Sequence, residues 1–272
     1  MANAVVQRDI GPPASLRRLC PHLPRLSRAL PAVLLFLALL GALQIGLPAL
    51  GVPSYLLPTP SRVLARLLDP ASGLLGHLAA TASAGLGGLI VGALAGLALA
   101  ALFVAARPVE RALYPWVLVS QTLPAAALAP LLTIWFGNGL APRIAMAALF
   151  AFFPILLNTA QGLRRVGTEQ IDLLRAWGAT PAQIFRLLRI PAALPAFFAG
   201  LRIGATLAVV GAIVGELAGA SSGLGYVISV ATYHLQTDRV FAAVTLAAAL
   251  SLGLYLAIGA VERRVVFWQS EH

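Results

Sequence analysis

Residues 168–195, TEQIDLLRAWGATPAQIFRLLRIPAALP, form a charged segment that separates two long apolar runs. The segment contains three arginines: Arg175, Arg186 and Arg189. A charged side chain at the centre of a bilayer costs about 2.5–3.5 kcal/mol on insertion scales, so we expect the whole segment to lie in water. It therefore marks a point at which the chain leaves the membrane and returns to it.

Turn and capping signals divide this segment into two short helices. Thr180, Pro181 and Gln183 are typical of a capping box that opens the second helix, and Pro191 is expected to end it. Gly178 and Ala179 form the elbow between the two helices. A helix-turn-helix that binds DNA has a similar outline, but this segment is flanked by apolar runs and lacks a soluble dimeric domain. The sequence therefore indicates no nucleic-acid partner.

Composition places the chain among membrane proteins. Of its 272 residues, 60% are hydrophobic and 10% are charged, and the mean hydropathy is +0.89. Six apolar runs reach or approach the length of about 20 residues that a membrane helix needs. They are residues 31–50, 78–104, 112–136, 144–160, 192–218 and 240–261. A soluble protein would have too few polar residues to cover six such runs, so we predict an all-α polytopic membrane protein with about six transmembrane helices.

The arginines predict the orientation of these helices. With six spans both termini lie on one side, and placing them in the cytoplasm satisfies the positive-inside rule. The arginines then predicted to be cytoplasmic are Arg8, Arg17, Arg18, Arg25, Arg28, Arg107, Arg111, Arg164, Arg165, Arg175, Arg186, Arg189, Arg263 and Arg264. Those predicted to be outside are Arg62, Arg66, Arg143 and Arg239. This topology and contact with anionic lipid account for the net charge of +10.

The same topology gives the domain organisation. Residues 1–30 are predicted to be a cytoplasmic segment, 31–265 a single transmembrane domain, and 266–272 a cytoplasmic tail. The first apolar run is about 20 residues long and no A-x-A cleavage pattern follows it, so we expect a retained span instead of a signal peptide. The domain includes a cytoplasmic loop at about residues 161–191.

Missing residue types exclude several kinds of chemistry. All nineteen basic residues are arginine, so the chain has no G-x-x-x-x-G-K-[ST] phosphate loop and is not predicted to hydrolyse ATP itself. The four histidines are scattered without ligand spacing, and Cys20 has no second cysteine to pair with. We expect no metal, no cofactor on this chain, and no enzymatic activity.

Several motifs resemble one family of membrane proteins. Asp172, Gly178, Ala179, the Arg189-Ile190-Pro191 run and Leu194-Pro195 are similar to the cytoplasmic "EAA" loop of bacterial ABC-importer permeases, although Asp172-Leu173-Leu174 replaces the family's Glu-Ala-Ala. Further runs resemble the nitrate, sulfonate and taurine branch of these permeases, and the resemblance covers roughly residues 55–268. These runs are residues 57–60, 121–124, 134–137, 152–154, 200–204 and 215–225.

The resemblance implies a type I ABC importer permease fold and alternating access. It implies a bacterial inner-membrane protein that works as a homodimer with two ATPase subunits, which bind the ATP, and a soluble substrate-binding protein. The residues that it implies for ATPase coupling are Asp172, Leu173, Arg175, Ala176, Trp177, Gly178 and Ala179. Without the resemblance, Leu173, Ala176 and Trp177 at helical spacing fit either a docking face or a face that lies on the bilayer, and the arginines fit a simple anchor.

Polar residues within the spans are candidates for the translocation pathway. Pro124 and Pro130 free backbone carbonyls beside Gln121 and Thr122, which a substrate or neighbouring hydroxyls could use. Glu216 is the only acidic residue within the predicted spans. Because Arg202 lies roughly 21 Å away along the same helix, Glu216 must pair with another span, stay protonated or face a wet cavity. Both a pathway role and a structural hydrogen bond are consistent with the sequence.

Glycines repeat every four residues in two of the predicted spans. Gly88, Gly92 and Gly96 form one row, and Gly211, Gly215 and Gly219 form the other. Such rows let helix backbones approach closely. The second row fits packing within one chain or a position near a subunit interface.

Substrate identity stays open at this stage. The resemblance suggests nitrate, a sulfonate or taurine, but residues 121–130 (QTLPAAALAP) are also similar to permeases for aromatic or heterocyclic compounds such as thiamine precursors. A secondary transporter or channel would be favoured by inverted repeats or several intramembrane charges, and the sequence has neither. A membrane enzyme would need a nucleophile–base pair or a metal cluster.

Overall fold

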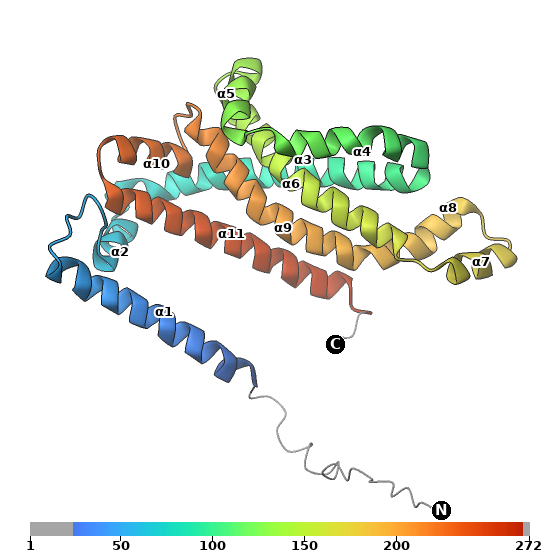
Figure 1. The fold of residues 1–272 in the computed structure, drawn as a ribbon, viewed down its shortest axis with the longest axis horizontal. Helices are drawn as coiled ribbons and strands as arrows, with labels where there is room; N and C mark the ends of the chain where they lie inside the picture. Colours follow the sequence, from blue (N-terminus) through green and yellow to red (C-terminus); the bar gives the residue numbers. More distant parts are fainter. Residues whose placement is uncertain (1–23, 269–272) are drawn as a thin grey trace, which may run out of the picture. The chain divides into compact units, whose positions relative to one another are not determined.

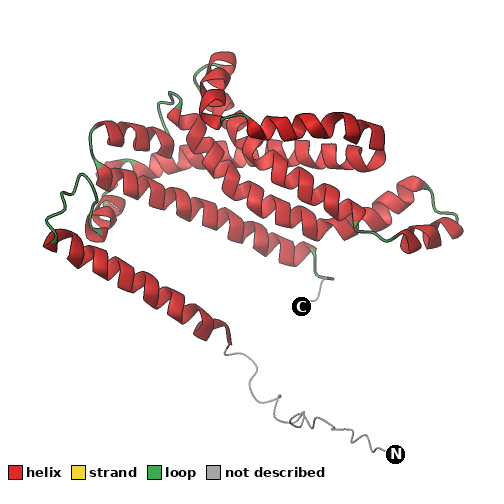
Figure 2. Cartoon of the chain, in the orientation of Figure 1, coloured by secondary structure: helices red, strands yellow, loops and turns green. Residues whose placement is uncertain are grey.

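The computed structural model describes residues 24–268, and every secondary-structure element in this range is a helix (Figure 2). This confirms the all-α prediction. Backbone contacts divide the chain into two compact units, residues 1–52 and 53–272. The first unit contains α1 (Pro24–Ala49), in which Leu30–Ala49 is long and apolar enough to cross a membrane. The predicted segment 1–30, with Cys20, and the tail 266–272 lie mostly outside the described residues, so their placement stays a prediction.

The second unit begins with two short elements, and the first of its long apolar helices follows them (Figure 1). Its elements are α2 (Pro60–Leu68), η2 (Pro70–Ser72), α3 (Leu74–Ala105), α4 (Arg107–Thr122), α5 (Ala125–Phe136), α6 (Leu140–Arg164), α7 (Thr168–Ala176), α8 (Pro181–Ile184), η3 (Phe185–Arg189), α9 (Ile190–Leu217), α10 (Leu224–Tyr233) and α11 (Thr237–Val265). Residues 24–268 contain five helices long enough to span a membrane, or six if the bent pair α4–α5 is counted as one span.

The third predicted span is not one continuous helix. Residues 112–136 are divided between α4 and α5, whose axes differ by 102°. Pro124 has no N–H to donate to the preceding turn, and it forces Leu123 into an extended conformation (φ −70°, ψ 129°). The kink expected at this proline is therefore a complete break.

The prediction that Pro191 ends the second short helix is wrong. The chain stays helical from Pro181 to Leu217, a stretch of 37 residues. A π-helical turn, η3, precedes the proline, and the N–H of Ile190 donates to the carbonyl of Phe185, five residues earlier. The wider turn lets the helix pass a residue that cannot donate and that crowds an ordinary α-turn.

The centre of the second unit is α6, which packs between α3 and α9. A methyl group on Gly92 of α3 would come within 2.8 Å of the carbonyl oxygen of Ala148, and one on Gly211 of α9 within 2.8 Å of the carbonyl oxygen of Met146. Both rows of glycines are therefore needed for close packing against α6. Gly219, the expected third member of the second row, lies beyond α9, and a methyl group placed on it would meet no neighbouring atom within 4 Å.

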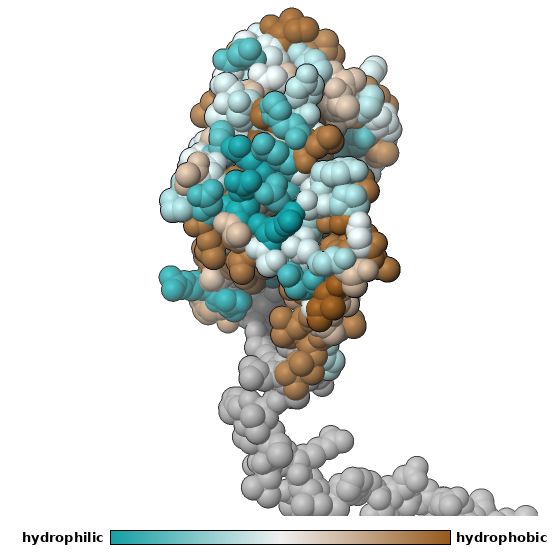
Figure 3. All heavy atoms as spheres, turned by 90° about the vertical axis from the view of Figure 1, so that its left-hand side faces the viewer, coloured by the Kyte–Doolittle hydropathy of each residue, from teal (hydrophilic) through white to brown (hydrophobic). Residues whose placement is uncertain are grey.

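The second unit has two distinct ends. In Figure 1, α7 and α8 lie at one end of the long helices, and α2 and α10 lie at the opposite end. Seen from the α2 and α10 end, hydrophilic residues gather at the centre of the face and hydrophobic residues lie around them (Figure 3). At this end, Arg66 of α2 forms a salt bridge to Asp238 of α11 at 3.0 Å. Arg66 is one of the arginines predicted to lie outside, and it is at the opposite end from the charged loop.

Candidate functional site

The candidate coupling segment, residues 168–189, folds as its capping signals predict. Gly178 has φ +81°, a left-handed conformation that favours glycine, and it makes the elbow after α7. Thr180 accepts a hydrogen bond from the N–H of Gln183 at 3.3 Å, while the side chain of Gln183 accepts one from the N–H of Thr180 at 2.8 Å. These two bonds form the predicted capping box and fix the start of α8.

Two opposite faces of α7 have different surroundings. Leu173 and Trp177 project into solvent, with 54% and 77% of their surface exposed, and Ala176 is also exposed. Ile171 is buried on the other face, and Arg175 follows it one turn later. Among residues 24–268, nothing covers the expected apolar face. Asp172 pairs with Arg175 at 3.1 Å, and both side chains are largely exposed.

A second candidate region is a cavity of about 500 Å³ at the break between α4 and α5. Gln121 lines this cavity together with residues from α4, α5, α6 and α9. Thr122 does not line it, and its hydroxyl donates to the carbonyl of Val119 at 2.8 Å. The structure therefore separates the two polar residues that the sequence placed together.

Two prolines leave backbone acceptors without their usual donors beside this cavity. Pro124 cannot donate to the carbonyl of Ser120, and Pro154 cannot donate to the carbonyl of Phe150. Ser120 and Phe150 both line the cavity. At membrane depth, irregular backbone is tolerated only where protein buries it or where it lines a wet cavity. The helix break therefore makes this cavity a candidate for the translocation pathway.

Glu216 lies elsewhere and is fully enclosed. Its side chain is 1% exposed and it does not line the cavity of Gln121. Its carboxylate accepts hydrogen bonds from the hydroxyl of Thr81 at 2.9 Å and from the N–H of Gly225 at 2.7 Å. Of the three environments expected for Glu216, the structure gives the pairing with another span, since Thr81 belongs to α3.

Glu216 belongs to a network that the sequence did not reveal. Thr81 also accepts from the N–H of Leu224 at 2.7 Å, and Nδ1 of His77 accepts from the N–H of Gly223 at 3.1 Å. Arg143, which is 7% exposed, donates to the carbonyl of Ser222 at 3.1 Å. Side chains from α3, α6 and α9 thus hold four consecutive residues, 222–225, at the start of α10. Glu216 was the signal of this site in the sequence, and its partners were not predicted.

A salt bridge between two of the long helices also escaped prediction. α11 continues past the expected end of its span to Val265 and carries Glu262, which forms a salt bridge with Arg202 of α9. Glu216 is therefore not the only acidic residue in the spans as they are observed. The guanidinium of Arg202 also lies 5.5 Å from the ring centroid of Tyr255. Arg202 and Glu262 hold α9 against α11.

The sequence matches one protein family and several named transport permeases. Residues 88–267 match the family of the "Binding-protein-dependent transport system inner membrane component". The formylaminopyrimidine transport permease protein ThiX of Halalkalibacterium halodurans is 36% identical over 245 residues, which cover 90% of this chain and 98% of the relative. The riboflavin transport system permease protein RibX of Chloroflexus aurantiacus is 37% identical over 84% of this chain and 85% of the relative.

More distant relatives include the taurine transport system permease protein TauC of Escherichia coli, which is 30% identical over 79% of this chain and 81% of the relative. Among solved structures, an inward-facing conformation of the MetNI methionine ABC transporter matches with a TM-score of 0.60 and 25% identity. That match covers 72% of this chain and 98% of the other chain. It confirms the expected fold.

The network around Glu216 predicts how two substitutions differ. Glu216→Ala leaves the N–H of Gly225 without its acceptor and leaves the hydroxyl of Thr81 with only the carbonyl of His77, and a buried unsatisfied group costs about 1–3 kcal/mol. We expect a clearly lower thermal midpoint for the purified chain in detergent, and a smaller decrease for Glu216→Gln, which keeps one acceptor oxygen. The exposed Glu169→Ala is the control. A variant Glu216→Ala that melts like the wild type but loses transport would show that the carboxylate acts on the pathway instead.

Proposed function

This chain belongs to the family of binding-protein-dependent transport system inner membrane components, and we propose the assembly, orientation and substrate class with which it works. It is the membrane-spanning permease subunit of an ABC importer, a transport component and not an enzyme. Two features of the structure support the rest of the proposal. One is an exposed apolar face on a capped loop outside the spans, and the other is a cavity at a helix break within them.

The permease works with an ATPase subunit, a soluble binding protein and a second copy of itself. Leu173, Ala176 and Trp177 on α7 are the contact face for the ATPase, and Asp172, Arg175, Gly178 and Ala179 fix its shape. ATP binds and is hydrolysed on that partner. The second copy covers part of the apolar surface of α4 and α5, where Trp116, Ile134 and Trp135 are 72%, 75% and 69% exposed. The remaining apolar surface contacts lipid.

The chain lies in the bacterial cytoplasmic membrane with both termini inside. The arginines of the α3–α4 turn, of α7 to η3 and of the last turn of α11 then all lie at the cytoplasmic end. The arginines of α2 and the first turn of α11 lie outside, where the binding protein docks.

The transported solute is a small neutral heterocyclic compound. None of the residues that line the cavity of about 500 Å³ is charged, and the lining includes Phe150, Phe153 and Met146 with Gln121 at its edge. An aromatic pair contributes roughly 0.5–1.5 kcal/mol beyond the area that it buries, and an amide can both donate to and accept from a ring nitrogen or carbonyl. The relatives that transport formylaminopyrimidine and riboflavin support this class.

An aliphatic sulfonate, taurine or nitrate is the second candidate. It is supported by the taurine relative and by the sequence runs that resemble that branch. An anion in this cavity would lose its hydration without meeting a cation, which is a large cost. The heterocycle is therefore the better fit to the cavity.

The first prediction concerns orientation. In a Cys20→Ser background, a cysteine at Thr168 should resist a membrane-impermeant thiol reagent in intact cells, and one at Ser72 should react. Thr168 lies at the start of α7 and Ser72 in η2, at opposite ends of the second unit. Permeabilised cells provide the control in which both positions react. Reaction at Thr168 in intact cells would contradict the orientation.

A second prediction concerns coupling. Gly178→Pro cannot adopt φ +81°, so the exposed face of α7 should be misplaced and should bind the ATPase less well. We expect uptake and co-purification of the ATPase to fall together while the permease still inserts. Gly167→Ala, at a position with an ordinary φ of −66° and no neighbour within 4 Å, is the matched control. Normal uptake by the Gly178→Pro variant would show that the segment is only an anchor.

The third prediction concerns the substrate. Deletion of the gene should abolish growth that depends on an external pyrimidine or flavin precursor, while growth on taurine or an alkanesulfonate as sulfur source should continue. Phe150→Ala and Gln121→Ala should each reduce uptake of the heterocycle by about tenfold, on the scale of 1.4 kcal/mol, without loss of the assembled complex. Thr122→Ala, beside the cavity but not lining it, should transport normally. Loss of growth on the sulfonates alone would favour the second candidate.

A further inference from the structure

Two adjoining hollows lie between α7 and the turn that joins α3 to α4. Their volumes are about 360 and 440 Å³, and Val104, Ile171 and Arg189 line both. Arginines dominate their polar lining: Arg107, Arg111, Arg164, Arg175 and Arg189. Glu110 is the one acidic residue that lines either hollow. The two hollows therefore form one basic cleft.

Carboxylates of the chain neutralise only part of this charge. Glu110 pairs with Arg164 at 2.5 Å, and Asp172 pairs with Arg175 at 3.1 Å. Within residues 24–268, no carboxylate forms a salt bridge with the other three arginines of the cleft, which are Arg107, Arg111 and Arg189. Three unpaired guanidinium groups around one concave surface repel each other and attract an anion.

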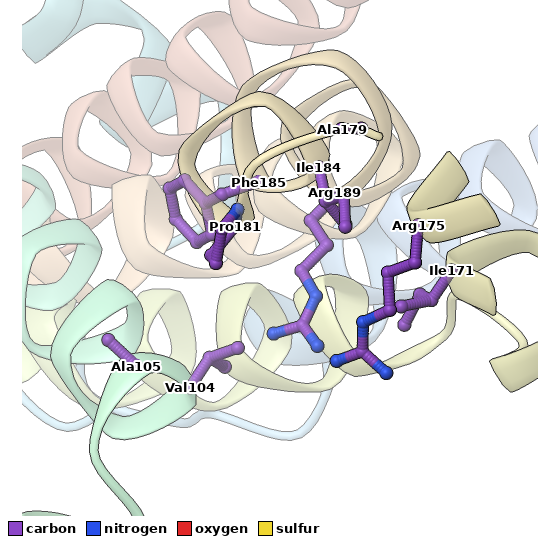
Figure 4. Close-up of a pocket in the computed structure, with 9 residues that line it drawn as sticks. All are labelled: Val104, Ala105, Ile171, Arg175, Ala179, Pro181, Ile184, Phe185 and Arg189. Atoms are coloured by element: carbon purple, nitrogen blue, oxygen red, sulfur yellow. The ribbon is translucent and has the colours of Figure 1, made fainter. Parts of the chain in front are cut away.

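The close-up in Figure 4 shows how the cleft is arranged. The side chains of Arg175 and Arg189 extend next to each other from the coupling segment into the hollow, on the side where Val104 and Ala105 of α3 lie. Phe185, Ile184 and Pro181 form an apolar wall on the other side. The cleft thus joins an arginine-rich part to an apolar part.

The apolar part continues along the helices as a separate groove. This groove has a volume of about 230 Å³ and lies between α3, α6 and α9, with Leu97, Ala101, Ala193 and Phe197 among its lining residues. It shares Phe185 with one basic hollow and Leu163 with the other. A single ligand could therefore place a charged group among the arginines and a hydrocarbon chain in the groove.

We propose that this site binds an anionic phospholipid, with its phosphate among Arg107, Arg111 and Arg189 and one acyl chain in the groove beside Leu97 and Phe197. Guanidinium groups bind phosphate through charge-assisted, often bidentate, hydrogen bonds. Basic pockets between transmembrane helices on the cytoplasmic side bind lipid headgroups in this way. A free phosphate ion would use the arginines but would leave the groove unexplained.

The bound lipid would contact both parts that must move together. Arg189 and Phe185 belong to the π-turn η3, which joins α8 to α9, and Arg107 and Arg111 belong to the start of α4. Occupancy would therefore hold the coupling segment against the α3–α4 turn. The inference rests on the proposed orientation and is independent of the transported substrate.

Lipid retention by the purified importer complex tests the proposal. Complexes are stripped with detergent, incubated with phosphatidylglycerol or with phosphatidylcholine, washed, and analysed for retained lipid by mass spectrometry. The variant Arg107→Gln/Arg111→Gln should retain at most about one tenth of the phosphatidylglycerol that the wild-type complex retains. Arg263→Gln/Arg264→Gln removes the same charge from the last turn of α11 without touching the cleft, and should retain it normally. Phosphatidylcholine should be retained poorly by all.

A second pair of variants tests the groove. Ala101→Phe fills the groove and should reduce retention of phosphatidylglycerol, whereas Ala95→Phe, at an exposed position on the opposite face of the same helix, should not. Equal retention by both arginine pairs, or equal retention of the two lipids, would overturn the proposal. Displacement of the lipid by excess inorganic phosphate, together with no effect of Ala101→Phe, would overturn it in favour of a free-anion site. The assay does not measure uptake, so a failure here is distinct from a failure of the proposed transport function.

Discussion

The close approach of α6 to two glycine-bearing helices is the constraint on which the second unit depends. Lipid supplies no hydrophobic force between helices, so association in a membrane relies on van der Waals contact and hydrogen bonds. Gly88 and Gly92 of α3 and Gly200 and Gly211 of α9 bring both backbones against the backbone of α6 at distances that no larger residue allows. Because α3 and α9 are held on the same helix, Thr81 and Glu216 are close enough to share a hydrogen bond.

Polar backbone groups in irregular segments of this chain have two different kinds of surroundings. At residues 222–225 side chains bond the irregular backbone, with His77, Thr81, Glu216 and Arg143 each making a bond to it. Near the α4–α5 break, the carbonyls to which Pro124 and Pro154 cannot donate belong to Ser120 and Phe150, which line a cavity. The first arrangement fixes a loop in one position, and the second leaves acceptors for a passing ligand. This difference is why Gln121 is the better pathway candidate and Glu216 the better structural one.

Local signals in the sequence predicted local structure well. The capping box at Thr180, the elbow at Gly178 and the exposed face at Leu173 and Trp177 depend on residues a few positions apart, and all three were confirmed. Two prolines had different outcomes, and only the prediction for Pro191 was wrong. Pro124 broke its span completely, whereas Pro191 was accommodated by a π-turn. A proline removes one donor in either case, and the tertiary surroundings decide whether the helix bends, widens or stops.

Partners that are distant in the sequence could not be predicted in the same way. Glu216 and Thr81 are separated by 135 residues, and only the packing of α3 and α9 on α6 shows that they meet. Glu262 was missed because its span extends four residues past the point at which the apolar run ends, and Arg202 had no visible partner without it. The basic cleft combines residues from α4, α6, α7 and η3, which the sequence had assigned to a general positive-inside signal. Composition predicts the charge at that end, but only the fold gathers it around a cavity.

One continuous helix connects the regions that these arguments treat separately. From Pro181 to Leu217 the chain stays helical for 37 residues, or about 55 Å at 1.5 Å per residue. Its first turns, α8 and η3, follow α7 and carry Arg189 of the basic cleft. Its middle carries Arg202, which pairs with Glu262. Its last turn carries Glu216, which accepts a hydrogen bond from the N–H of Gly225 at the start of α10. A helix transmits displacement along its axis far better than a loop does, so it provides a route from α8 to residues 222–225. The π-turn at 185–189 departs from α-helical hydrogen bonding, and it is therefore a natural point at which such a movement can be absorbed or passed on.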